Sequence, residues 1–90
     1  MTSYEFEVAA KNAIIRDVKE KYGENYTIKD IDVVWMAHML HNKKGIFIDS
    51  GKNLRLYEVT YNKDRNEIYL DMYEKQAKKV IPANEFNFNT

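Results

Sequence analysis

Apolar residues recur at helical spacing in the first part of the chain. Thr2 and Glu5 have the spacing of a capping box, which begins a helix. Gly23 supplies the left-handed conformation that commonly ends one. The apolar positions between them are Phe6, Ala10, Ala13, Ile14 and Val18. We therefore predict one amphipathic helix that ends near Tyr22 and packs on a sheet, because a broad apolar stripe needs a broad partner.

The middle of the chain contains two segments that favour strands. Residues 31–40 (IDVVWMAHML) are rich in β-branched and aromatic side chains, which is typical of a central strand, and this strand could extend to His41. Residues 42–45 break the pattern. Residues 45–48 form either a separate short strand or a continuation of the first strand past a bulge, and we favour the separate strand.

Residues 54–73 (LRLYEVTYNKDRNEIYLDMY) contain two alternating, tyrosine-rich runs around a short polar break, which predicts a β-hairpin. If Asn62 lies opposite Glu67, the loop is KDRN and parity determines which residues face each other. One face then pairs Tyr57 with Met72, Val59 with Leu70 and Tyr61 with Ile68, and we assign this face to the core. The other face carries Leu56, Glu58, Thr60, Tyr69, Asp71 and Tyr73, which we predict to be the partner-binding residues.

In this register Glu58 faces Asp71, and opposed like charges destabilise a strand pair. Two solutions remain open. A basic residue from a third strand lies nearby, or the pairing shifts by two residues and places Glu58 beside Tyr69. Facing carboxylates can also share a proton or hold a cation, which makes these two the best enzyme candidates. We rank catalysis last, because charged residues are ordinary on an uncovered sheet face.

Taken together, the patterns predict a single α+β domain over residues 1–82. An N-terminal helix packs on a three- to four-stranded antiparallel sheet in the order α-β-β-β. Residues 74–81 fit either a helical turn or an extended strand end. The asparagine-rich residues 83–90, which include Phe86 and Phe88, are predicted to be a flexible tail. The predicted core consists of Phe6, Ala10, Ile14, Val18, Trp35, Tyr57, Val59, Ile68 and Leu70.

Composition narrows the classes of function. The 90 residues include 14 acidic and 14 basic side chains and no cysteine. Zero net charge provides no general attraction to nucleic acid or anionic membranes, and the missing thiols exclude disulfides and thiolate zinc sites. The N-terminus lacks the pattern of a signal peptide, and no apolar run approaches the roughly 20 residues of a membrane span. We therefore expect a cytoplasmic protein.

The Val33-Val34-Trp35 sequence and residues 57–75 (YEVTYNKDRNEIYLDMYEK) resemble a small uncharacterised family encoded by Gram-positive bacteria and their phages and prophages. The likeness spans roughly residues 28–81 and is carried by residues that build the fold. The resemblance implies a phage or prophage origin and a stable hairpin. It carries over no catalytic residue, because the family has no known activity.

The remaining candidates for chemistry are weak. His38 and His41 would point to opposite faces of a strand, so we expect no shared metal, and no cofactor is predicted. Tyr69 and Tyr73 could stack on unpaired bases, but exposed tyrosines more often form protein interfaces. We expect an accessory protein without enzymatic activity that binds protein through the uncovered face or the exposed sheet edges. A homodimer through this surface is the leading hypothesis, and a host or phage protein is the second candidate partner. Binding of single-stranded nucleic acid is the alternative, and catalysis by the facing carboxylates is the third hypothesis.

Overall fold

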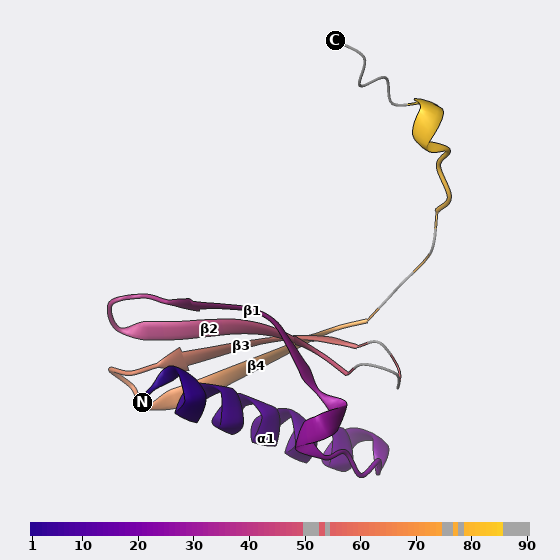
Figure 1. Ribbon diagram of the computed structural model, residues 1–90. Coiled ribbons are helices and arrows are strands. Elements are labelled where there is room, and N and C mark those ends of the chain that lie inside the picture. Colours follow the sequence, from indigo (N-terminus) through magenta and orange to yellow (C-terminus); the bar gives the residue numbers. More distant parts are fainter. Residues whose placement is uncertain (50–52, 54, 75–76, 78, 86–90) are drawn as a thin grey trace.

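The protein is an α-helix packed on one antiparallel sheet (Figure 1). The computed structural model describes residues 1–49, 53, 55–74, 77 and 79–85. The elements are α1 (Ser3–Tyr22), the 3-10 helix η1 (Ile28–Asp30), the strands β1 (Asp32–His38), β2 (Asn42–Ile48), β3 (Leu56–Asn62) and β4 (Glu67–Tyr73), and the 3-10 helix η2 (Ala83–Glu85).

Both predicted ends of α1 are confirmed. The Thr2 hydroxyl accepts from the Glu5 N–H at 3.1 Å, and the Glu5 carboxylate accepts from the Thr2 N–H at 2.8 Å. Hydrogen bonds from the Thr2 backbone and side chain lower the pKa of Glu5, as expected for a carboxylate held by N–H and O–H donors. Gly23 has a φ of 68° and donates its N–H to the Lys19 carbonyl at 3.0 Å. The predicted apolar stripe is fully buried at Phe6, Ala10, Ile14 and Val18.

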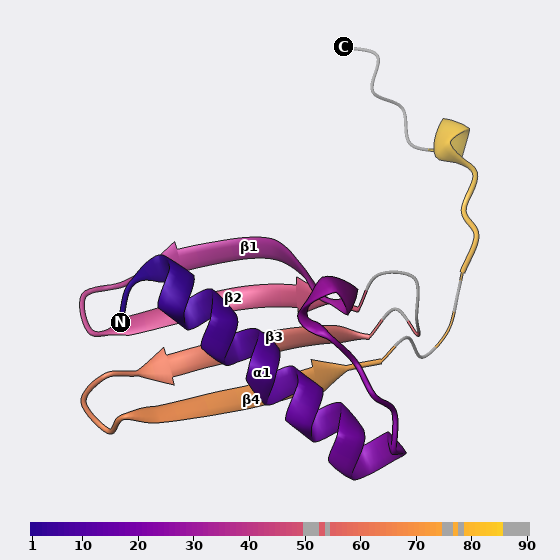
Figure 2. The same cartoon turned by 60° about the horizontal axis from the view of Figure 1, so that its bottom comes forward.

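The four strands are hydrogen-bonded in chain order, β1-β2-β3-β4, and each pair is antiparallel. Figures 1 and 2 show α1 along one side of the sheet only, crossing it diagonally from β1 towards β4. The predicted α+β architecture is therefore confirmed. The residue 31–40 strand was expected to be central, but β1 is an edge strand and ends at His38, because a simple meander leaves its first strand at an edge.

The segment after β1 also differs from the expectation. Residues 42–45 do not break the pattern but begin β2, a separate strand of seven residues. The hairpin follows the predicted register, with Asn62 opposite Glu67 and residues 63–66 as the loop. Asn66 ends this loop with a φ of 51°, a left-handed conformation that asparagine tolerates better than most residues.

Most of the predicted core is confirmed, and two members are wrong. Trp35 is 50% exposed because a bulge at Val34 shifts the register: Val33 pairs with Phe47, but Trp35 pairs with Ile46. Ile68 is 37% exposed because it lies on the edge strand β4, where α1 covers the sheet incompletely. The fully buried core also contains residues that the sequence did not single out, namely Tyr26, Ile31 and Phe47.

Two predictions concern C-terminal residues of which the structure describes only some. Residues 77 and 79–82 belong to no helix or strand, while residues 75, 76 and 78 lie outside the described part of the chain. Of the predicted tail, residues 83–85 form η2, and Phe86 and Phe88 lie outside the described residues.

Candidate partner-binding surface

The sheet face that α1 leaves uncovered presents side chains in rows, because residues paired across antiparallel strands point to the same side. We call this the open face. Its rows, from β1 to β4, are Asp32, Ile48, Leu56 and Tyr73; then Trp35, Ile46, Glu58 and Asp71; then Ala37, Lys44, Thr60 and Tyr69; and last, from β2 to β4, Asn42, Asn62 and Glu67. All six residues predicted to bind a partner lie on the open face.

An apolar band runs across one end of the open face. Trp35 and Tyr73, at the outer strands, are 50% and 51% exposed. The side chains between them are half-buried, and the register makes them neighbours: Ile46, Ile48 and Leu56. A contiguous apolar surface of this kind is unusual on a protein that stays alone in solution. Parity predicted its β3 and β4 members, and the bulge at Val34 adds the tryptophan.

The open face is acidic. It carries four carboxylates, Asp32, Glu58, Glu67 and Asp71, and among its described residues one cation, Lys44. The Lys44 ammonium lies 3.2 Å from the Glu58 carboxylate. Glu58 faces Asp71 as predicted, and the basic residue from a third strand is the solution that the structure adopts. The register is not shifted.

The facing carboxylates lie on an open sheet, and neither of two hollows in the surface reaches them. One hollow is a groove between α1 and β4, lined by Ala9, Asn12, Ala13, Arg16, Ile68 and Leu70. The other is a pocket at the hairpin end of the sheet. Neither lining includes Glu58 or Asp71, so neither hollow would hold a substrate against these two carboxylates.

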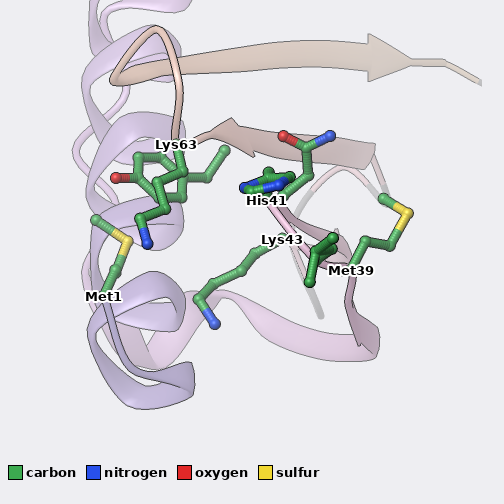
Figure 3. A pocket seen from close by; sticks show the side chains of 8 residues that line it. Met1, Met39, His41, Lys43 and Lys63 are labelled. Carbon is green, nitrogen blue, oxygen red and sulfur yellow. The ribbon is translucent and has the colours of Figure 1, made fainter.

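The pocket at the hairpin end is lined by Met1, Met39, Leu40, His41, Asn42, Lys43, Tyr61 and Lys63. Figure 3 shows Met1 and Met39 on opposite sides, with the other labelled side chains between them. His41 lies in the turn before β2, and its Nδ1 is 3.8 Å from an Asp64 carboxylate oxygen. The lining combines apolar and cationic groups and contains no carboxylate or hydroxyl other than that of Tyr61.

The two histidines do not lie on opposite faces of one strand, as the sequence predicted, because β1 ends at His38 and His41 lies in the turn before β2. His38 lies at the end of β1, with Nδ1 2.9 Å from the Lys43 ammonium and Nε2 2.8 Å from the Ser3 hydroxyl. An ammonium group can only donate, so Nδ1 accepts and Nε2–H faces Ser3. Within residues 1–49, 53, 55–74, 77 and 79–85, no three histidine, aspartate or glutamate side chains form a group that could hold a metal ion.

A buried polar cluster where β2 ends and β3 begins was not predicted. Asp49 is fully buried and accepts from the Tyr26 hydroxyl and the Arg55 backbone N–H, both at 2.7 Å. The Arg55 guanidinium lies 3.7 Å from the centre of the Tyr22 ring. Its nitrogens are 3.6 Å from Glu24 and 3.8 Å from Glu74. Arg55 precedes β3 and shares parity with Tyr57, so its place on the helix side could have been inferred from the alternation.

This cluster has a structural role. It joins the end of α1, the start of β3 and the residue after β4 through charged and hydrogen-bonded side chains. Because parity places Arg55 on the helix side, the open face has no guanidinium of Arg55 near Tyr73, where it would have favoured nucleic-acid binding.

Comparison with known proteins places the chain in a family. Residues 7–83 match a family described as a "Family of unknown function (DUF6275)". The chain belongs to the DUF6275 family. The DUF6275 match includes all four strands and every residue of the open face. No curated protein and no solved structure matches the chain.

Membership of the DUF6275 family agrees with the resemblance to an uncharacterised family and assigns no activity. In the described parts of this DUF6275 protein, no helix is both long and apolar enough to cross a membrane.

Proposed function

We propose that this DUF6275 protein is an accessory protein of phage or prophage type that binds another protein through its open face and catalyses no reaction. The observation that carries the proposal is the uncovered apolar band, with Trp35 and Tyr73 each about half exposed. Tyrosine and tryptophan dominate protein interfaces because they bury a large area with little loss of conformational entropy. The phage or prophage origin is supported by the sequence resemblance alone.

The charges of the open face define the partner's chemistry. Besides Glu58, which is paired with Lys44, the open face presents the carboxylates of Glu67 and Asp71 on β4, and these favour a partner surface that is basic and partly apolar. Two copies that met face to face would oppose carboxylates across the interface. Nucleic acid is also disfavoured, because its phosphates require cations.

The tryptophan provides a direct assay, because the chain contains only one. Proteins captured from a bacterial host lysate are purified and titrated against the DUF6275 protein. A partner that covers the open face should shift the Trp35 emission to shorter wavelength and bind the Tyr73→Ala variant at least about tenfold more weakly. The matched control is Tyr4→Ala, because Tyr4 is exposed on α1. Equal affinity for both variants, with unchanged tryptophan emission, would refute the proposal.

The nucleic-acid alternative has its own test. A mixed-sequence single-stranded oligonucleotide is added at low salt and Trp35 emission is followed. We expect no change, because the open face repels phosphates. Binding that weakens with added salt and with Tyr69→Ala would overturn protein binding as the function of this face.

A further inference from the structure

The β4 strand is an uninterrupted free edge. It pairs with β3 on one side, and no described strand pairs with its other side. All seven residues keep a regular register with β3. The other edge, β1, is interrupted by the bulge at Val34, and bulges are a common device that prevents edge-to-edge pairing. Of the two edges, β4 is therefore the one suited to accept another strand.

The helix side of this edge is apolar and incompletely covered. Ile68 is 37% exposed, and Leu70 and Met72 are half-buried. A groove lies between these strand residues and α1, whose flank there contains Ala9, Asn12, Ala13 and Arg16. Figure 2 shows α1 crossing the sheet so that its C-terminal end passes over β4, which leaves the first half of the strand less covered.

We propose that two copies of this chain pair through β4, antiparallel, about a twofold axis at Leu70. The product is a continuous eight-stranded sheet with both α1 helices on the same side. A continuous antiparallel sheet requires paired residues to point to the same side, so a symmetric pairing must be centred on a residue. Near the middle of β4 that residue is Tyr69, Leu70 or Asp71.

Charge selects among these three centres. An axis at Tyr69 would place Glu67 opposite Asp71 twice, and an axis at Asp71 would place that carboxylate opposite its own copy. Directly opposed like charges destabilise strand pairs. An axis at Leu70 instead places Asp71 opposite Tyr69 and Glu67 opposite Tyr73. Each carboxylate then faces a phenol: Tyr73 can donate to Glu67, and the Tyr69 hydroxyl, which donates to Glu67 of its own strand at 3.3 Å, would have to turn to donate to Asp71.

The same register also covers the exposed apolar residues on the helix side of β4. Leu70 meets its own copy, and Ile68 meets Met72 of the second copy, so the half-exposed apolar residues cover each other. The twofold axis also brings the flank of the second α1 to the far side of the groove. Charge, edge geometry and apolar exposure thus favour one occupant, a second copy of this chain.

This dimer does not require the proposed function, although Tyr73 belongs to both surfaces. The pairing uses the backbone edge of β4, its helix-side residues and the open-face pairs of Glu67 with Tyr73 and Asp71 with Tyr69, and it leaves Trp35 on the opposite edge of each sheet. Edge pairing should therefore leave tryptophan emission unchanged, whereas a partner on the open face should shift it. Failure of one proposal is thus distinguishable from failure of the other.

Cysteine substitution locates the axis, because the chain has no cysteine of its own. Three single variants are prepared, Tyr69→Cys, Leu70→Cys and Asp71→Cys, and treated with a mild oxidant or a short thiol cross-linker. Only Leu70→Cys should form a covalent dimer in high yield, because only this residue faces its own copy across the axis. Cross-linking that is strongest at residue 69 or 71, or absent from all three, would refute the proposed register.

The oligomeric state tests the interface separately. Sedimentation of the unmodified chain at micromolar concentration should show a dimer, and Ile68→Glu should convert it to a folded monomer by burying a charge at the seam. The matched control is Ile28→Glu, another exposed isoleucine, which should remain dimeric. Circular dichroism checks that both variants are folded. A monomeric parent chain, or an Ile68→Glu variant that remains dimeric, would overturn the proposal.

Discussion

Gly45 shows how a single missing side chain shapes the core. It lies on the helix side of β2, where an added Cβ atom would be 2.7 Å from a ring carbon of Phe47 and 3.3 Å from the Met36 side chain. Phe47 is fully buried and has little room to move. We expect Gly45→Ala to lower the free energy of unfolding by about 1–3 kcal/mol, measured by urea denaturation. The control, Lys44→Ala on the open face, should cost less than about 1 kcal/mol, and equal losses would contradict this explanation.

Two buried tyrosines differ in one respect, the partner of the hydroxyl. The Tyr26 hydroxyl donates to buried Asp49 at 2.7 Å, whereas the Tyr57 hydroxyl is buried beside the Arg55 side chain and makes no well-aligned hydrogen bond within the described residues. Tyr26→Phe should cost about 1–3 kcal/mol, because it leaves the Oδ2 atom of the buried Asp49 carboxylate without its hydroxyl donor, while Oδ1 keeps the Arg55 N–H. Tyr57→Phe removes the same group, a phenol hydroxyl, and should change the free energy of unfolding very little. Chemical denaturation compares the two, and similar losses would show that the Tyr57 hydroxyl is bonded in solution.

At the scale of elements, the alternation of side chains predicted the hairpin correctly and β1 incorrectly. The two strands of the hairpin alternate without interruption, so parity alone gave the register and the six residues of the candidate surface. In β1, Val33, Val34, Trp35 and Met36 are all apolar, and no break in the pattern marks the bulge at Val34. The bulge turns Trp35 from the predicted core to the open face.

Other parts of the candidate surface depend on contacts between distant segments. Lys44 and Ile46 belong to it because β2 lies beside β3, and nothing within β2 indicates which neighbour it has. Asp49 is buried because Tyr26 and the backbone of Arg55 donate to it. A polar residue in a turn-like segment predicts exposure, so such burial is found only when the donors are seen in three dimensions.

The hairpin loop between β3 and β4 contains one left-handed residue, Asn66. Asn66 adopts a φ of 51°, which costs most residues roughly 1–2 kcal/mol and β-branched residues more. Asn66→Gly should keep or raise the midpoint of thermal unfolding, and Asn66→Val should lower it. The control is Asp64→Val in the same loop, where the backbone is not left-handed and the loss should be smaller. If both valine variants unfold at the same temperature, the left-handed residue does not limit the stability of the hairpin.

At the scale of the whole molecule, the buried tyrosines couple protonation to folding. Burial raises the pKa of Tyr57 to about 12, and burial together with the hydrogen bond to Asp49 raises the pKa of Tyr26 further. In the unfolded chain both phenols lose their protons near pH ~10. Between these values the unfolded state binds fewer protons than the folded state. These two phenols therefore leave the free energy of unfolding unchanged below about pH 10 and lower it as the pH rises towards 12.

An alkaline titration that follows tyrosinate absorbance and circular dichroism together tests this coupling. The buried phenols of Tyr26 and Tyr57 should ionise in a step that coincides with loss of the sheet signal, because they reach water only when the domain opens. Tyr57→Phe removes one of the two coupled groups and should make the unfolding less steep in pH. If the phenols of Tyr26 and Tyr57 ionise near pH ~10 while the fold is intact, they are not coupled to folding.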